Sequence, residues 1–471
     1  MNILQLPWLE FAILLSLLGA LCVSRCHDPI RASRWGLAFT GTVFGFTILA
    51  WLGHYLGVKA GDGWSLQTYY LGSRILELDA LSAPLAPSVA LLHFLTALAT
   101  ARTKMTRFSF SWSLASEAIR LATFSCTDPW LLISLLVLCT IPAYVELVNR
   151  GKPTRVYVLH MALFVGLLVL GWTFVEPAAN HNAQPAWAVI PLLAAILVRC
   201  GSVPVHCWLT DWFEHASFGN ALLFVAPLSG VYAAARLVLP IAPDWVLHSL
   251  GIVSLFTAIY AACMATIQQD ARRFFAYLFL SYSSLVLVGL ELVTSISLAG
   301  ALSLWFSVTL GLGGFGLTLR ALEARVGRLS LADFHGLYDN SPALAVCFLI
   351  TGLASVGFPG TLGFIATELL VDGAVEANLA IGIIVAFAAA LNGIAVLRAY
   401  FRLFTGKRHA STVSLQIGLR ERIAVLTLSA LILGGGLFPQ LGISSRHDAA
   451  QEILHGRQEN LRTAARHWRV P

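Results

Sequence analysis

The sequence predicts an all-α polytopic membrane protein with about fourteen transmembrane helices, built from two inverted five-helix repeats whose broken helices are the seventh and the twelfth. Hydrophobic residues make up 58% of the 471 residues and charged residues 11%, well below the roughly 25% charged residues of a water-soluble domain. The mean hydropathy is +0.77. Apolar runs recur along the whole length, and no polar block between them is long enough to fold alone.

A window of about 20 mostly apolar residues locates the predicted spans. They are residues 8–25, 36–57, 77–98, 112–126, 128–148, 156–175, 187–211, 217–239, 245–266, 272–293, 297–321, 342–371, 375–401 and 421–439. These spans divide the chain into four segments. The segments are 1–111 with helices one to three, 112–239 with the first repeat, 245–405 with the second repeat, and 406–471 with the last helix and a basic amphipathic tail.

Lysine and arginine concentrate in every second loop. One set of loops holds Arg25, Arg31, Arg34, Arg102, Lys104, Arg107, Arg150, Lys152, Arg155, Arg272, Arg273, Arg320, Arg325, Arg328, Arg402, Lys407, Arg408, Arg420 and Arg422. The other set holds only Lys59 and Arg74. Because cytoplasmic loops are rich in Lys and Arg, we expect a multi-pass protein of the cell's inner or plasma membrane with its N-terminus outside.

The same rule accounts for the net charge of +6 without a nucleic-acid partner. The tail conflicts with this topology, because an even number of spans places it outside although it is basic. Its arginines are Arg446, Arg457, Arg462, Arg466 and Arg469. Either the tail is an exception or the count is wrong by one span. We expect an amphipathic helix over 446–468, lying on the surface or on a partner.

Two predicted spans contain helix-breaking residues near their middles. The seventh reads AILVRCGSVPVHCWLTDW, with Gly201 and Pro204, and the twelfth reads LASVGFPGTLGFIATELL, with Pro359, Gly360 and Gly363. Such breaks persist at membrane depth where they are buried in protein or line a wet cavity. Two of them five spans apart are typical of inverted-repeat transporters, and we favour this interpretation over ordinary proline kinks.

Arg199 is the clearest candidate for a functional residue. It lies roughly 18 Å into the seventh span, counted from Trp187 at about 1.5 Å per residue, and a charge at that depth is costly. It therefore needs a carboxylate, a group of carbonyls or water beside it, and Glu117 on the fourth span is one candidate. A transport role and a structural ion pair account for Arg199 equally well.

Other polar residues follow the breaks or interrupt apolar spans. His206, Asp211, Glu214 and His215 suggest a polar cytoplasmic mouth, where histidine can titrate near neutral pH. Their spacing matches no zinc signature, so we predict no metal. His160 and His93 are candidates for a proton route, although a backbone carbonyl is the commoner partner of a lone histidine. Glu368 is the candidate beside the second break. The resulting set for a proton or ion path is Arg199, His206, Glu117, Glu368, Asp211, Glu214, His215 and His160.

Several segments resemble one known superfamily. VRCGSVPVHCWLTDW is similar to the broken seventh helix of the antiporter-like subunits (L, M and N type) of respiratory complex I, NADH:quinone oxidoreductase, and of Mrp cation/proton antiporters. Their pattern is a Lys five residues before Pro-x-His-x-Trp-Leu-x-Asp. The segments QQDARRFFAYLFLSYSS, SGVYAAARL, LDALSAPL and GLYDNSPALAVCFLITGLASVGFPGTLGF also resemble this superfamily. The resemblance covers residues 75–405.

The chain departs from that superfamily at the residues thought to carry protons. The family's path is thought to use membrane-embedded lysines and a glutamate on the fifth helix. Here the seventh-helix lysine corresponds to Arg199, the fifth-helix glutamate to Val137, and the twelfth-helix Lys or Glu to Thr367 beside Glu368. All lysines lie in loops: Lys59, Lys104, Lys152 and Lys407. Arginine keeps its proton, so Arg199 preserves the electric field of a relay lysine and removes the proton hop.

The resemblance implies a proton- or cation-translocating membrane subunit of a multi-subunit complex. Three assemblies fit the resemblance: a complex I-like oxidoreductase, an Mrp-type antiporter and a DAB-type system for inorganic carbon (bicarbonate or CO2). The missing lysines favour the DAB-type system. Partners would then be other membrane subunits in the bilayer and a soluble subunit, either zinc-bearing and carbonic-anhydrase-like or redox-active. We expect no cofactor and no catalysis by the chain alone, beyond a translocase role in an NADH:quinone oxidoreductase-like complex. The alternative is a non-conducting membrane anchor derived from such a subunit.

Overall fold

Helices make up nearly all of the structure, a computed structural model that describes residues 3–58, 74–175, 186–407 and 416–467. No β-strand occurs in these ranges, which contain two isolated bridges, Leu76 with Cys126 and Asp270 with Ser330. The first half contains η1 (Ile3–Gln5), α1 (Trp8–Ser24), α2 (Pro29–Tyr55), α4 (Leu85–Leu98), η3 (Arg102–Arg107), α5 (Phe110–Ser125), α6 (Pro129–Leu138), α7 (Ile141–Asn149), α8 (Arg155–Phe174), α9 (Ala186–Cys200), α10 (Cys207–His215), α11 (Phe218–Val225), α12 (Ser229–Ala233) and η4 (Ala234–Val238).

The second half contains fewer and longer helices. They are α13 (Asp244–Ile267), α14 (Ala271–Glu291), α15 (Ser295–Val326), α16 (Pro342–Ser355), α17 (Leu362–Ala377), α18 (Leu379–Phe404), α19 (Leu419–Leu437) and α20 (Gln440–His467). Each of the fourteen predicted spans falls on one of these helices or on a consecutive group of them. Within the described ranges, eight helical segments are long and apolar enough to cross a membrane by themselves, and a ninth arises if α19 and α20 count as one bent span. The count of fourteen stays a prediction.

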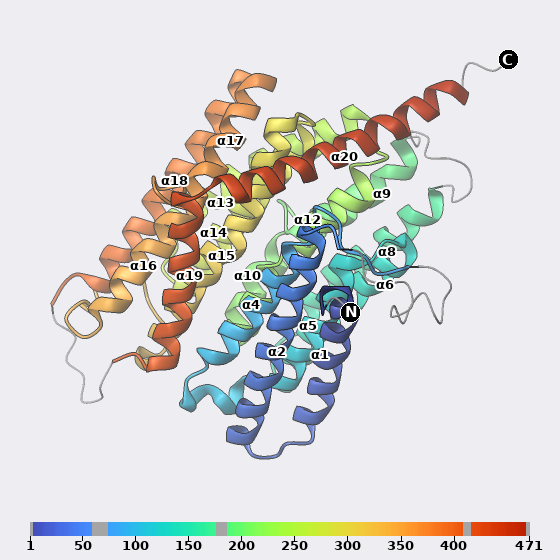
Figure 1. Cartoon of the computed structure of the whole chain (residues 1–471). Helices are drawn as coiled ribbons and strands as arrows, with labels where there is room; N and C mark the ends of the chain where they lie inside the picture. Colours follow the sequence, from blue (N-terminus) through green and yellow to red (C-terminus); the bar gives the residue numbers. More distant parts are fainter. Residues whose placement is uncertain (1–2, 59–73, 176–185, 408–415, 468–471) are drawn as a thin grey trace.

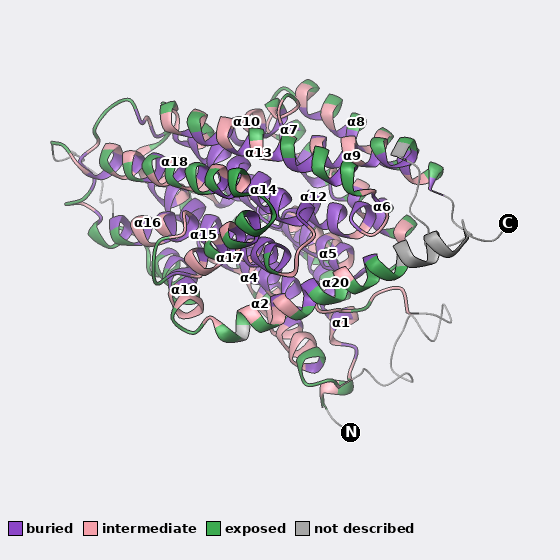
Figure 2. Cartoon of the chain, turned by 90° about the horizontal axis from the view of Figure 1, so that it is seen from above, coloured by how far each residue is buried: buried purple, intermediate pink, exposed green. Residues whose placement is uncertain are grey.

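Two central helices form the core, and apolar helices surround them. α14 is buried along its whole length and α15 along most of it, whereas less than half of α8 or α18 is buried. Figure 2 shows this distribution, with buried residues in the middle and exposed residues around the rim. Rim side chains such as Leu159 and Ile252 are about 70% exposed. Exposed leucine and isoleucine all around a bundle are what lipid tails cover, as in a polytopic membrane protein.

Both broken spans are interrupted by segments of equal length. Residues 201–206 separate α9 from α10, and residues 356–361 separate α16 from α17. Gly201 and Gly357 have φ values of +74° and +78°, a conformation that glycine adopts readily. Pro204, Pro359 and Gly360 lie within these segments. Gly363 does not: it is in the first turn of α17, where a Cβ would come 1.8 Å from the carbonyl oxygen of Ala354.

The basic tail forms helix α20, which crosses the end of the bundle opposite the basic loops (Figure 1). α19 begins at the basic end, where Glu421 pairs with Arg325 at the end of α15. α20 then packs at the other end: Arg457 pairs with Asp244 at the start of α13, and the Arg446 guanidinium lies over the Phe306 ring. Both arginines are buried. These two arginines of the tail are therefore bound within the protein and do not lie in a loop.

Candidate functional site

Arg199 lies in the last turn of α9, directly before the first break. Its side chain is buried, and its Nη2 donates a hydrogen bond of 2.7 Å to Ser229 Oγ at the start of α12. The guanidinium also lies 4.5 Å from the ring centre of Phe224 and 5.7 Å from that of Trp208. The cation is thus held by a hydroxyl group and by two aromatic faces, which attract cations strongly when water is excluded.

The expected ion pair between Arg199 and Glu117 does not form. Across the ranges that the structure describes, no carboxylate oxygen lies within 4.0 Å of the Arg199 guanidinium. Glu117 is fully buried on α5 and accepts a hydrogen bond of 3.4 Å from Ser16 on α1, and its other oxygen has no partner. The prediction was wrong because helix packing turns Glu117 toward α1, which a span-by-span analysis of the sequence does not reveal.

A second buried arginine, Arg120, lies one turn after Glu117. Its Nη1 is 3.2 Å from His93 Nε2, and His93 Nδ1 is 3.2 Å from Ser113 Oγ. Arg120 and His93 are both almost completely buried. His93 thus has side-chain partners in addition to the backbone of Ser113. Arg120 was missed as a site residue, although its spacing of three from Glu117 inside an apolar span was a usable signal.

Backbone groups freed by the first break are bonded within the protein. The Trp208 indole of α10 donates to the Val198 carbonyl of α9 at 2.9 Å, so it spans the gap between the two half-helices. The Val203 amide donates to Thr257 Oγ1 of α13 at 3.1 Å. These bonds matter because an unsatisfied peptide group inside a membrane costs several kcal/mol.

Around the second break the buried polar groups are neutral. Thr361 Oγ1 donates to the Phe358 carbonyl at 2.6 Å, and Ser355 is buried at the end of α16. Asn392 of α18 donates to Ser281 Oγ of α14 at 2.9 Å, and Tyr282 lies beside both Asn392 and Ser355. The second break therefore adjoins amide and hydroxyl groups, whereas the first adjoins a guanidinium.

Sequence comparison gives this architecture a family. Residues 121–392, more than half of the chain, match the model described as "NADH:quinone oxidoreductase/Mrp antiporter, TM". The chain belongs to this family. It is also 25% identical to "NAD(P)H-quinone oxidoreductase chain 4 1" of Nostoc sp., over 97% of this chain and 93% of that one, and 26% identical to "NADH-quinone oxidoreductase subunit M" of Rickettsia bellii, over 58% and 56%.

Solved structures share the fold. A chain of respiratory complex I from Thermus thermophilus with bound NADH superposes with a TM-score of 0.80 at 24% identity, covering 95% of this chain and 99% of that one. A chain of the Mrp complex from Dietzia sp. superposes with a TM-score of 0.81 at 19% identity, covering 96% and 98%. The resemblance of the sequence to this superfamily and the all-α multi-pass membrane fold are thereby confirmed.

In this family member the other candidate residues are dispersed. His160 Nδ1 lies 2.8 Å from the Val156 carbonyl, so His160 has the backbone partner that is common for a lone histidine. His206 lies directly before α10, and its ring lies 5.3 Å from that of Tyr260. Glu368 is exposed on the outer side of α17. None of these three contacts Arg199.

Three candidates form ion pairs at the basic end of the bundle. Asp211 lies 3.1 Å from His215 one turn later, and Glu214 accepts from Arg273 at 2.6 Å. Arg328 bonds both Glu214, at 3.2 Å, and Asp270, at 2.7 Å. Burial raises the pKa of Glu214, but the hydrogen bonds and charges of Arg273 and Arg328 outweigh burial and leave that pKa below its usual value. Glu214 connects α10 of the first repeat to the start of α14 and to the segment after α15. The Asp211–His215 pair lies within α10 itself.

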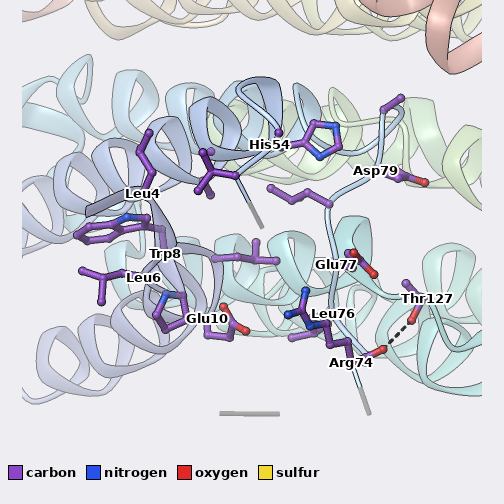
Figure 3. Close-up of a pocket in the computed structure, with 18 of the residues that line it drawn as sticks. Leu4, Leu6, Trp8, Glu10, His54, Arg74, Leu76, Glu77, Asp79 and Thr127 are labelled. Carbon is purple, nitrogen blue, oxygen red and sulfur yellow. Dashed lines mark hydrogen bonds between the residues drawn. The ribbon is translucent and has the colours of Figure 1, made fainter. Parts of the chain in front are cut away.

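A large cavity opens at the opposite end, near the start of α1 (Figure 3). It measures about 610 Å³ and lies between α1, the end of α2 and residues 74–80. Its polar side chains are those of Glu10, His54, Arg74, Glu77, Asp79, Thr127 and Glu452. Asp79 is already bonded to Arg236 of η4 at 2.5 Å and to Ser82. The cavity shares no lining residue with the surroundings of Arg199.

Proposed function

We propose that this chain is a proton- or cation-translocating membrane subunit of a multi-subunit complex, in the inner or plasma membrane with its N-terminus outside. One observation carries the proposal: two spans are interrupted by segments of equal length, the first packed on the buried helix α14 and the second on α14 and α15. Such paired interruptions are the usual position of a transport path. The named relatives are subunits of quinone oxidoreductases, which agrees with this role.

In this proposal the permanently charged residues and the titratable residues have different roles. Arg199 and Arg120 stay protonated and supply a positive field at mid-membrane. Glu117 of the first repeat and His93 of the preceding helix α4 are the buried groups that exchange protons, and one oxygen of Glu117 has no partner within the described protein. Proton transfer in this chain would therefore use residues on helices α4 and α5 in place of the membrane-embedded lysines of the family pattern.

Exposed carboxylates on α17 support contact with another membrane subunit. Glu368, Asp372 and Glu376 follow one another at intervals of four residues, so they lie on one helix face, and all three are exposed. Glu368 lies about two turns after the break, inside the predicted span 342–371, where contact of a charge with lipid is unfavourable. We infer that a neighbouring membrane subunit covers this face.

Measuring proton flux in vesicles that hold the intact assembly tests the proposal. We expect Glu117→Gln to lower flux at least tenfold, since a barrier change of about 1.4 kcal/mol already has this effect. Glu10→Gln is the matched control, because Glu10 lies on α1 outside the cluster, and it should keep the flux. Wild-type flux in both Glu117→Gln and His93→Gln would overturn the proposed relay.

A non-conducting membrane anchor is the second candidate, and the rigid binding of Arg199 by Ser229 and Phe224 favours it. It predicts that wild-type vesicles show no flux above empty vesicles.

The soluble partner is a separate question, and we propose a zinc-bearing, carbonic-anhydrase-like or a redox subunit. Purification of the assembly in mild detergent answers it: zinc in a soluble subunit favours uptake of inorganic carbon, and iron–sulfur protein favours a redox complex.

A further inference from the structure

Two buried arginines of the first repeat have no carboxylate in contact with them. Arg120 and Arg199 are about 2% and 5% exposed, and Glu117, one turn before Arg120 on α5, is fully buried. Neither arginine has a carboxylate within 4.0 Å in the part of the chain that is described. The other buried carboxylate of this repeat, Glu146, pairs with Arg150. The two cations therefore leave an excess of positive charge at this point of the bundle.

A small cavity lies beside the Arg199 side chain. It measures about 20 Å³, enough for one water-sized particle. Its polar lining comes from Arg199, Ser229 and Ser283, and Trp208 and Phe279 form apolar walls. Its lining also includes Gly230, where a Cβ would lie 2.6 Å from Cys200 Sγ and 3.2 Å from Arg199 Cγ. Glycine at 230 therefore lets α12 approach α9 closely at this point.

The chemistry of the lining selects the occupant. Arginine is a donor only, and one Arg199 N–H is used by Ser229. Because Ser229 Oγ accepts that bond, its own hydrogen is available to a second acceptor. A permanent cation and a hydroxyl donor in a site with few competing waters favour an anion, since electrostatic interactions strengthen as the dielectric constant falls. A water molecule fills the same volume but leaves the charge excess uncompensated.

We propose that the cavity beside Arg199 binds one monovalent anion of the size of chloride. A space of about 20 Å³ has room for one small ion. The anion would accept hydrogen bonds from the Arg199 guanidinium and the Ser229 hydroxyl, and Ser283 would line its other side. Its charge would neutralise the excess that Arg199 and Arg120 create. The site is independent of the proposed translocation, because a non-conducting anchor needs the same compensation.

Anion-dependent stability of the purified full-length chain tests this site. The protein is kept in a gluconate buffer of constant ionic strength, and bromide or chloride replaces gluconate stepwise while the melting temperature is recorded. We expect a saturable rise in melting temperature, as a ligand that binds only the folded state produces. Arg199→Gln should weaken the apparent bromide affinity by at least about tenfold. Arg320→Gln, which removes a partly buried arginine outside the cavity, should leave that affinity unchanged.

Two further measurements keep the test decisive. If Arg199→Gln does not fold, Ser229→Ala and Arg199→Lys replace it, and both should weaken bromide binding while the protein stays folded. The anomalous scattering of bromide should then give a peak between Arg199 and Ser283. Equal bromide affinity in the wild type and in these variants, or no bromide peak at that position, would mean that the cavity holds water and would overturn the proposal.

Discussion

The two broken spans use the same backbone arrangement and different electrostatics. In the first, a break over residues 201–206 adjoins Arg199, with Arg120 and Glu117 buried close by. In the second, a break over residues 356–361 adjoins Ser355, and the acidic residues of α17 are exposed. A transmembrane helix can therefore be interrupted with or without a charged residue beside the break. Only the first repeat keeps a permanent positive field inside the bundle.

Helix packing explains why both arrangements are stable. Neutral groups need only hydrogen bonds, and Asn392 and Ser281 supply one across α18 and α14. A buried cation needs more, and Arg199 receives one hydroxyl group and two aromatic rings. The cation at the first break therefore depends on more partners than the neutral groups at the second break, and substitutions at the first break should have larger effects.

The largest difference between the two broken spans should appear in proton transport. Arg199→Ala removes the fixed charge at the first break, and we expect proton flux in assembly-containing vesicles to fall at least tenfold, equivalent to about 1.4 kcal/mol in the barrier. Thr367→Ala changes the corresponding neutral position in the second repeat and should keep the flux within about twofold. Similar losses in the two variants would show that the two breaks contribute equally and would remove the distinction between them.

A large loss of stability is expected at Glu146, which anchors α11 in the first repeat. Its carboxylate accepts from the Ser217 amide at 3.0 Å and from Asn220 Nδ2 at 2.8 Å, and it is buried. Hydrogen bonds to a charged group contribute about 1.5–3 kcal/mol each, so Glu146→Ala should lower the free energy of unfolding by about 3 kcal/mol or more. Denaturant unfolding in detergent measures this, with Glu146→Gln as the control that keeps one acceptor and loses less.

The matching substitution in the second repeat, at Asn392, should lower the free energy of unfolding by a smaller amount. Asn392→Leu removes one neutral hydrogen bond to Ser281, and it also removes the Asn392 carbonyl oxygen, which has no partner. We expect a loss of about 1 kcal/mol in the free energy of unfolding. Asn392→Asp is the informative companion, because it places a carboxylate where the structure offers no cation, and it should destabilise more. If Asn392→Asp were the milder change, the second region would not be an electrostatically neutral site.

The smallest effect should come from the ion pairs at the basic end. The pKa of Glu214 lies below its usual value, so the carboxylate's pairing with Arg273 and Arg328 stabilises the fold above the usual pKa and is lost as the pH falls through the lowered one. Because both arginines are half-exposed, the contribution should stay under about 1 kcal/mol. The melting temperatures of wild type and Glu214→Gln, measured across the acidic range, should therefore converge as the pH falls. A constant difference between them would contradict this assignment.

The positions of the helices and their breaks were predictable, because they depend on local sequence. Runs of apolar residues specify helices in a membrane, and Gly201, Pro204, Pro359 and Gly360 all lie where the structure interrupts them. The partners of the charged residues were not predictable in the same way. Glu117, His93 and Glu368 each lie on a predicted span, but the sequence does not tell which neighbour the side chain faces.

By itself the sequence determined the membrane class and the pair of interrupted spans, which follow from residue type and spacing along the chain. The resemblance to the antiporter-like subunits added that Arg199 corresponds to a lysine of the family pattern. Only the tertiary structure decided that Ser229 and Phe224 hold Arg199, that Glu117 turns to Ser16, and that Glu368 faces outward. The physical reason is that these choices depend on the rotation of each helix about its axis, and packing against other helices sets that rotation.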